Sequence, residues 1–318
     1  MTEEDFKRCF RLFRCSTIED CLDFIDIYSN FLFTVIRRHQ HDKVISMADA
    51  KAKIILQMMF TKLQHLKGII SGIHYTSPDQ IELSGIIDPI VVGAHIRTTF
   101  EMVGMFNLIY TSTRSTDEKE ILYSLWAHAG LSYRQRFEEA VKNEENKIKA
   151  EEEKEQMNTL VQNIQSTLLY KNLSMENQEK ILHKLKSRDY LIRFDGVEVK
   201  FLSWQNLTEV MGVKKNILSN MYTYFSLYSH PSNVAVFQFA EMFEKGNEAF
   251  ERITVFNVNT QFILTSIFIA DYIKIFPQVL ETFNQINLVD QIVINFQNHL
   301  ARGEKYSIND ALQQLQPN

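Results

Sequence analysis

The sequence predicts an all-α protein, a multi-helix bundle with at most one short β-hairpin. Only 10 of its 318 residues are glycine and 5 are proline, whereas turns and hairpins depend on these two residue types. Apolar residues recur at helical spacing along most of the chain. Hydrophobic residues make up 45% and charged residues 23%, as in a typical folded soluble protein, so global disorder is excluded.

Helices are expected in succession along the chain. Residues 5–40 should form one or two helices, and another should run from about Ser46 to Ile73. The segment from Pro89 to Tyr110 is apolar on nearly every face, so its helix should lie at the centre of the bundle. A long helix should then begin near Asp117. Further helices are expected at about 174–186, 203–212, 214–229, 234–250, 252–275 and 278–301.

Two segments differ from this pattern. Residues Leu191 to Phe201 read as two short strands around Asp195-Gly196, a dipeptide typical of a type I′ turn. Residues 144–156 are an almost unbroken run of Glu, Lys and Asn that lacks the apolar repeat of a coiled coil. We expect a solvated projecting helix or a partly disordered arm there.

We expect a single helical domain over residues 1–318. Within it, an N-terminal lobe of residues 1–75 would pack on a core of residues 76–250, followed by C-terminal helices of residues 251–318. The most membrane-like stretch, Phe262 to Phe276, is shorter than the ~20 residues of a spanning helix, so it should be a buried core helix. The three cysteines lack the spacing of a zinc site, and their odd number fits a reducing compartment. We therefore expect a cytoplasmic protein without a metal, and the short apolar stretch predicts no membrane span.

Several familiar functional signatures are absent from the sequence. It has no glycine-rich phosphate loop, no HExxH, no GxSxG and no CxxC, and no cofactor is predicted. The formal net charge of −5 argues against general nucleic-acid binding, which requires surplus Lys and Arg. A local basic site for RNA or a nucleotide remains open.

The central helix carries one charged pair, Arg97 and Glu101. Four residues separate them, so they share one helix face. That face should pack against other helices, where charges must be paired because a lone buried charge is costly. A structural ion pair and a functional one, with Arg97 and Glu101 as catalytic groups, are both open.

A second concentration of polar groups lies in the segment YTYFSLYSHPSNVAVFQF, residues 222–239. His230 can serve as an acid or a base or can donate a hydrogen bond to a phosphate, although a lone histidine is more often a hydrogen-bonded structural residue. We expect Arg97, Glu101 and His230 to converge on one polar pocket. The predicted binding residues beside them are Tyr224, Tyr228, Ser229, Ser232 and Trp204.

These motifs together resemble a family of uncharacterised bacterial helical proteins. The shared parts are the Arg97-x-x-x-Glu101 helix, the Trp204-to-Gly212 segment, and Tyr222 through the Ser-His-Pro-Ser turn at Ser232. The likeness covers roughly residues 45–245. Proteins of that family are similar to HEPN domains, helical modules of many prokaryotic toxins and antiphage systems, which implies a HEPN-like core.

One departure from HEPN ribonucleases affects the expected function. Those enzymes carry an Arg and a His on one helix at a spacing that no pair here reproduces; Arg37 and His41 are one residue too close. Ribonuclease activity would therefore need Arg97 and His230 to meet from separate helices. The two open readings are a HEPN-like defence or toxin-type protein, and a non-enzymatic helical interaction protein with a protein partner or a second copy of itself.

Overall fold

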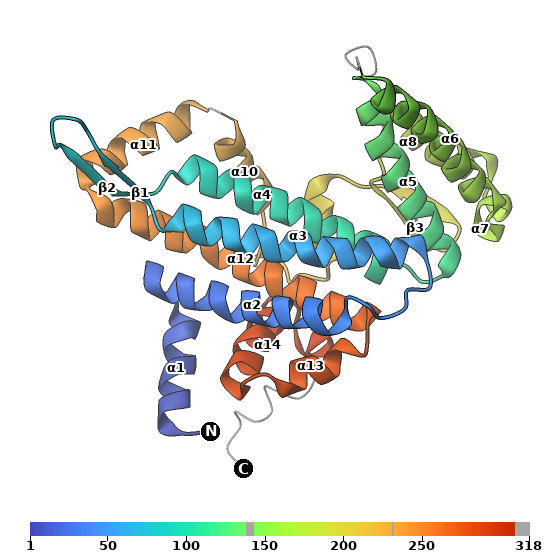
Figure 1. The fold of residues 1–318 in the computed structure, drawn as a ribbon. Coiled ribbons are helices and arrows are strands. Elements are labelled where there is room, and N and C mark those ends of the chain that lie inside the picture. The colour runs from blue at the N-terminus through green and yellow to red at the C-terminus, as the bar shows by residue number, and fades with distance from the viewer. Residues whose placement is uncertain (138–142, 231, 309–318) are drawn as a thin grey trace. The chain divides into compact units, whose positions relative to one another are not determined.

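The computed structural model describes residues 1–137, 143–230 and 232–308 of the chain. These residues are mostly helical, and they form fourteen α-helices and two short antiparallel hairpins (Figure 1). The predicted all-α fold class is confirmed. The chain divides into two compact units: unit 1 comprises residues 1–106 and 211–318, and unit 2 comprises residues 107–210. Unit 1 thus contains segments from both ends of the chain, whereas the N-terminal lobe, the core and the C-terminal helices expected from the sequence follow one another along the chain.

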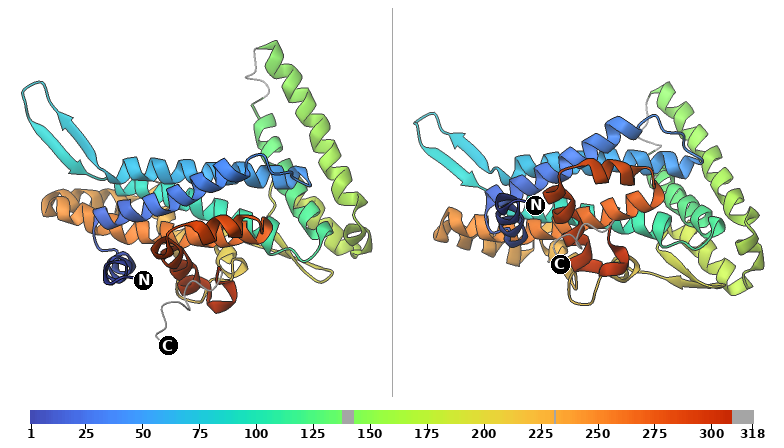
Figure 2. Two further views of the ribbon diagram at one scale, coloured as in Figure 1. Left: turned by 60° about the horizontal axis from the view of Figure 1, so that its bottom comes forward. Right: turned by 90° about the horizontal axis from the view of Figure 1, so that it is seen from below.

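Unit 1 contains the longest helices of the protein. Its elements are α1 (Glu3–Arg14), α2 (Ile18–His39), α3 (Met47–Ile70), β1 (Ile73–Thr76), β2 (Glu82–Ile86), α4 (Pro89–Phe106), α10 (Met221–Ser229), α11 (Asn233–Lys245), α12 (Asn247–Ile275), α13 (Val279–Gln285) and α14 (Leu288–Arg302). Helix α4 packs against α3, α10 and α12, and α12 also packs against α2 and α14 (Figure 2). The predicted central position of α4 is therefore correct.

Helix α12 is long and apolar enough to span a membrane by composition alone, but 72% of its most apolar window is buried within the protein. It is the core helix that the sequence predicted, which is compatible with a soluble protein.

A buried ion pair joins α12 to α14. The fully buried Arg302 donates from Nη1 to Asp271 at 2.7 Å and to the carbonyl of Met211 at 3.3 Å. Since breaking such a pair strands a buried charge, this contact fixes α14 on α12.

Unit 2 is built around an α5–α6 pair. Its elements are a π-helical turn (Asn107–Thr111), α5 (Thr116–Gln135), α6 (Glu144–Ser166), α7 (Leu168–Asn172), α8 (Met175–Ser187), β3 (Ile192–Asp195), β4 (Glu198–Phe201), a 3-10 turn (Trp204–Asn206) and α9 (Leu207–Val210). The β3–β4 hairpin pairs Ile192 with Phe201, in agreement with the prediction. The charged segment 144–156 is helical, and its buried Glu153 forms an ion pair with Arg134 of α5.

The structure corrects three details of the sequence prediction. A second hairpin, β1–β2, was missed because β1 exposes every side chain and so shows no burial alternation. The helix expected from residue 214 begins only at Met221, because Asn216 and Asn220 adopt left-handed backbone conformations. The helix expected over 278–301 is divided into α13 and α14, since Asn287 caps a new helix by accepting from the Val289 amide.

Candidate functional site

Arg97 and Glu101 form an ion pair on α4. The Arg97 Nε donates to Glu101 Oε1 at 3.2 Å, and their side chains are 19% and 29% exposed. The expected pairing is present, but the expectation that the pair is buried is wrong. The reason is that α4 has one partly open face beside α10, and the pair lies on it. Both groups are therefore held in place and still reach solvent.

His230 meets Arg97 from a different helix. It is the exposed residue that ends α10, and its Nε2 lies 3.4 Å from Arg97 Nη1, across 133 positions of sequence. A guanidinium can only donate, so Nε2 is the acceptor of this hydrogen bond. The sequence predicted that Arg97, Glu101 and His230 converge, and the structure brings these three side chains together.

Tyr222 is the third side chain that contacts Arg97. Its hydroxyl accepts from Arg97 Nη2 at 2.9 Å, and the guanidinium carbon lies 4.9 Å from the centre of its ring. Arg97 has five N–H donors, and three of them meet Glu101, His230 and Tyr222. The other two have no partner among the described residues. The guanidinium is thus oriented from three sides and keeps donors for a ligand.

Lys62 adds a second positive charge beside this group. It lies on α3, where its Nζ donates to Thr98 Oγ1 at 2.6 Å. Burial lowers the pKa of Lys62, and the nearby charge of Glu101 opposes that shift. We call Arg97, Lys62, Glu101 and His230 the Arg97 group; the first three together carry a net charge of +1, which suits an anion. Sequence analysis missed Lys62 because only the packing of α3 on α4 brings it here.

A close approach of two helices explains why His230 reaches Arg97. A Cβ atom at Gly93 of α4 would lie 2.6 Å from the Cβ of Tyr228 on α10, so only glycine fits at this point. Arg97 is one turn beyond Gly93 on α4, and His230 is two residues beyond Tyr228. The contact between Gly93 and Tyr228 therefore sets the separation of the two functional side chains.

The other predicted binding residues of unit 1 have different partners. The Tyr224 hydroxyl donates to Asn257 of α12, and the Tyr228 hydroxyl donates to Gln238 of α11 and lies 3.3 Å from the Tyr224 hydroxyl. Ser229 donates to the Phe225 carbonyl, and Ser232 caps α11 by accepting from the Ala235 amide. These four side chains bond to the protein itself, and no bond joins them to Arg97. Trp204 belongs to unit 2.

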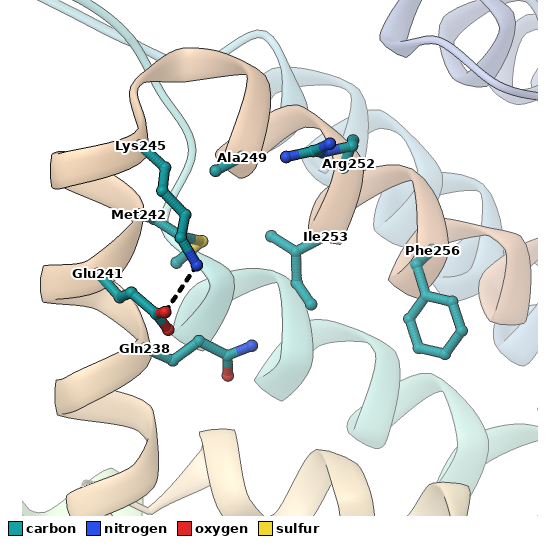
Figure 3. Close-up of a pocket in the computed structure, with 8 residues that line it drawn as sticks. All are labelled: Gln238, Glu241, Met242, Lys245, Ala249, Arg252, Ile253 and Phe256. Carbon is teal, nitrogen blue, oxygen red and sulfur yellow. Dashed lines mark hydrogen bonds and ion pairs between the residues drawn. The ribbon is translucent and has the colours of Figure 1, made fainter.

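Gln238, the partner of Tyr228, also lines a cavity between α11 and α12. Figure 3 shows its walls, with Glu241, Met242 and Lys245 on α11 facing Arg252, Ile253 and Phe256 on α12. The cavity volume is about 320 Å³, and Lys245 donates to Glu241 at 2.6 Å at its edge. None of its lining residues belongs to the Arg97 group, so the two features are separate.

Comparison of the chain with family models, curated proteins and solved structures found no match. In the described part of the chain, no group of three or more His, Cys, Asp or Glu side chains is arranged to hold a metal ion. The geometry of the Arg97 group is therefore the basis for a function.

Replacing Gly93 with alanine should destabilise the protein by about 1–3 kcal/mol, because the added methyl group overlaps Tyr228 and forces α10 away from α4. Gly130→Ala is the matched control: Gly130 is also helical, and a Cβ there meets nothing within 4 Å. It should be neutral or stabilise by up to about 1 kcal/mol. Urea denaturation measures both changes, and equal stability of the two variants would contradict the close approach.

Protonation of His95 should destabilise the fold at mildly acidic pH. Burial, with the nearby charges of Lys62 and His65, lowers the pKa of His95 from 6.5 to about 4, and its Nε2 is buried with no hydrogen-bond partner in the described part of the chain. The unfolded chain binds this proton near pH 6.5 and the folded chain only near pH 4. The free energy of unfolding is therefore unaffected by His95 protonation above pH 6.5. It should fall by up to about 1.4 kcal/mol per pH unit between these values.

The His95→Gln variant should lose this part of the pH dependence when urea denaturation is repeated at pH 7, 6 and 5. The exposed His41 provides the control, because His41→Gln should keep the wild-type slope. Parallel pH profiles for the wild type and His95→Gln would show that the histidine is not held neutral.

Proposed function

We propose that this chain is a toxin-type or antiphage-defence protein that cleaves RNA, with Arg97 and His230 acting on one phosphodiester. The observation that carries the proposal is the 3.4 Å approach of Arg97 Nη1 to His230 Nε2 at a partly open face. An arginine and a histidine side by side match the needs of phosphodiester cleavage, which are an anion-binding donor and a base. The resemblance to HEPN-related proteins supports the same class of activity.

The proposed roles follow from the contacts. Arg97 binds a non-bridging phosphate oxygen through its uncommitted N–H groups, while Glu101 and Tyr222 keep the guanidinium in position. His230 exchanges its hydrogen bond from Arg97 for one from the ribose 2′-hydroxyl and accepts that proton at Nε2, and the 2′-oxygen forms a bond to phosphorus. The bond from phosphorus to the 5′-oxygen breaks, and that oxygen takes a proton from water. The products are a 2′,3′-cyclic phosphate and a 5′-hydroxyl end.

The overall charge of the protein limits how RNA can bind. A net charge of −5 provides little general attraction for a polyanion, so affinity has to come from a local site such as the Arg97 and Lys62 pair. A few phosphate contacts produce a shallow dependence of binding on salt. The proposed enzyme is therefore selective, has a short binding footprint and lies in the cytoplasm with its substrate.

A non-enzymatic interaction role is the second candidate, and one surface of unit 1 favours it. Helix α11 exposes large apolar side chains, among them Val234, Val236, Phe237 and Phe243, of which Phe237 is 67% exposed. Contiguous exposed apolar side chains are typical of protein–protein interfaces. In this role a protein partner or a second copy of the chain would cover α11, and the Arg97 group would be structural.

Cleavage of RNA separates the two candidates. The wild type should cut a 5′-labelled single-stranded RNA of mixed sequence, leave 2′,3′-cyclic phosphate ends, and slow growth when expressed in bacteria. Arg97→Ala and His230→Ala should each lower the cleavage rate by about 10²–10⁴-fold, because each removes a group that acts in the transition state. Circular dichroism checks that both variants fold.

Arg37→Ala and His41→Ala are the matched controls. They change the exposed arginine and histidine whose spacing comes nearest to that of HEPN ribonucleases, and they should cleave like the wild type. If folded Arg97→Ala and His230→Ala proteins behave like the wild type, or if the wild type cuts no RNA, the enzymatic proposal is wrong and the interaction role stands.

A further inference from the structure

Unit 2 contains a pocket whose walls are unusually rich in aromatic side chains. It lies between α5, the end of α8 and the chain that flanks the β3–β4 hairpin, and its volume is about 600 Å³. It is lined by Trp126 and Tyr133 of α5 together with Tyr190 and Trp204. These are the only two tryptophans of the chain. The volume falls in the range of small-molecule sites.

The aromatic side chains are only partly covered by the protein. Trp126, Tyr190 and Trp204 are half-buried, and Tyr133 is 52% exposed. The rings of Tyr190 and Trp204 meet edge to face at 6.1 Å, which holds both rings in fixed orientations. Large aromatic faces that remain open in a hollow are a platform on which a planar ring can stack.

The charged residues of the pocket favour an anionic ligand. Asp189 is fully engaged, because its carboxylate pairs with Lys184 and accepts from the amides of Tyr190 and Leu191. Arg188 is exposed, and its guanidinium has no hydrogen-bond or ion-pair partner among the described residues. It also ends α8 in the left-handed conformation, at φ 59°, where glycine is usually favoured. Arg188 is thus the charged residue of the pocket that has no opposite charge paired with it among the described residues.

We propose that this pocket binds a single nucleotide, with the base stacked on the tryptophan and tyrosine rings and the phosphate held by Arg188. A planar ring joined to a phosphate is the ligand that satisfies both the aromatic walls and the arginine, whereas a cation would be repelled. The nucleotide is either a free mononucleotide or one unit of an RNA strand. This site is independent of the Arg97 group, which belongs to unit 1.

Intrinsic fluorescence reports this site directly, because both tryptophans of the full-length chain line it. Titration with AMP should quench their emission in a saturable manner. Adenosine should bind more weakly, and neither inorganic phosphate nor choline should have an effect. A single-stranded oligoadenylate that binds tighter than AMP would identify an RNA strand as the source, whereas AMP that binds as tightly or tighter would identify a free nucleotide.

Two variants test the proposed contacts. Gly130 lines the pocket, and a Cβ there meets nothing within 4 Å, so Gly130→Phe should fill the pocket without disturbing the helix and should abolish AMP quenching. Gly130→Ala is its control and should still bind. Arg188→Gly keeps the left-handed conformation and should weaken AMP binding by about tenfold or more while adenosine binding stays unchanged.

Three results would overturn the proposal: no saturable response to AMP or to the oligonucleotide, equal binding by Gly130→Phe and the wild type, or a response to choline. The outcome is separate from that of the RNA cleavage experiment. Arg97→Ala and His230→Ala should bind AMP as the wild type does, so a failure of the proposed cleavage leaves this site standing.

Discussion

The contact between Gly93 and Tyr228 is the constraint on which the candidate site depends. Interatomic distances across a helix pair are set by the smallest side chains at the crossing, and here α4 offers no side chain at all. One turn further along, α4 carries Arg97, and the end of α10 carries His230. The site thus requires a packing contact between residues that have no chemical role. A residue of any larger size at position 93 would separate the two groups that the proposed chemistry needs.

The surrounding helices hold this crossing rigid. Helix α12 lies against both α4 and α2, and its buried face carries Asp271, whose ion pair with Arg302 anchors α14. Other polar side chains of this bundle bond to a neighbour within the protein, as Tyr224 does by donating to Asn257. The Arg97 group differs from them because it is oriented by several partners and still keeps exposed donors. Orientation together with access is what distinguishes a binding site from a structural ion pair.

The sequence was sufficient for the fold class, the central helix and the convergence of Arg97, Glu101 and His230, since these follow from composition, periodicity and the cost of isolated polar groups. It was insufficient where tertiary contacts decide. Lys62 looks like a surface lysine until α3 packs on α4, and the four predicted polar partners near His230 proved to bond within the protein. The sequence singled out Trp204 but not its pocket, because Trp126 lies far from it in sequence and only folding brings both residues to the same pocket.

The central claim is that Arg97 and His230 act as one unit, and a double-mutant cycle on RNA cleavage tests it most directly. Cleavage rates would be measured for the wild type, Arg97→Ala, His230→Ala and the double variant, all shown to be folded. Residues that act together are strongly non-additive, so the double variant should lose little more activity than the more damaged single variant. Losses that simply multiply, or four equal rates, would contradict the claim.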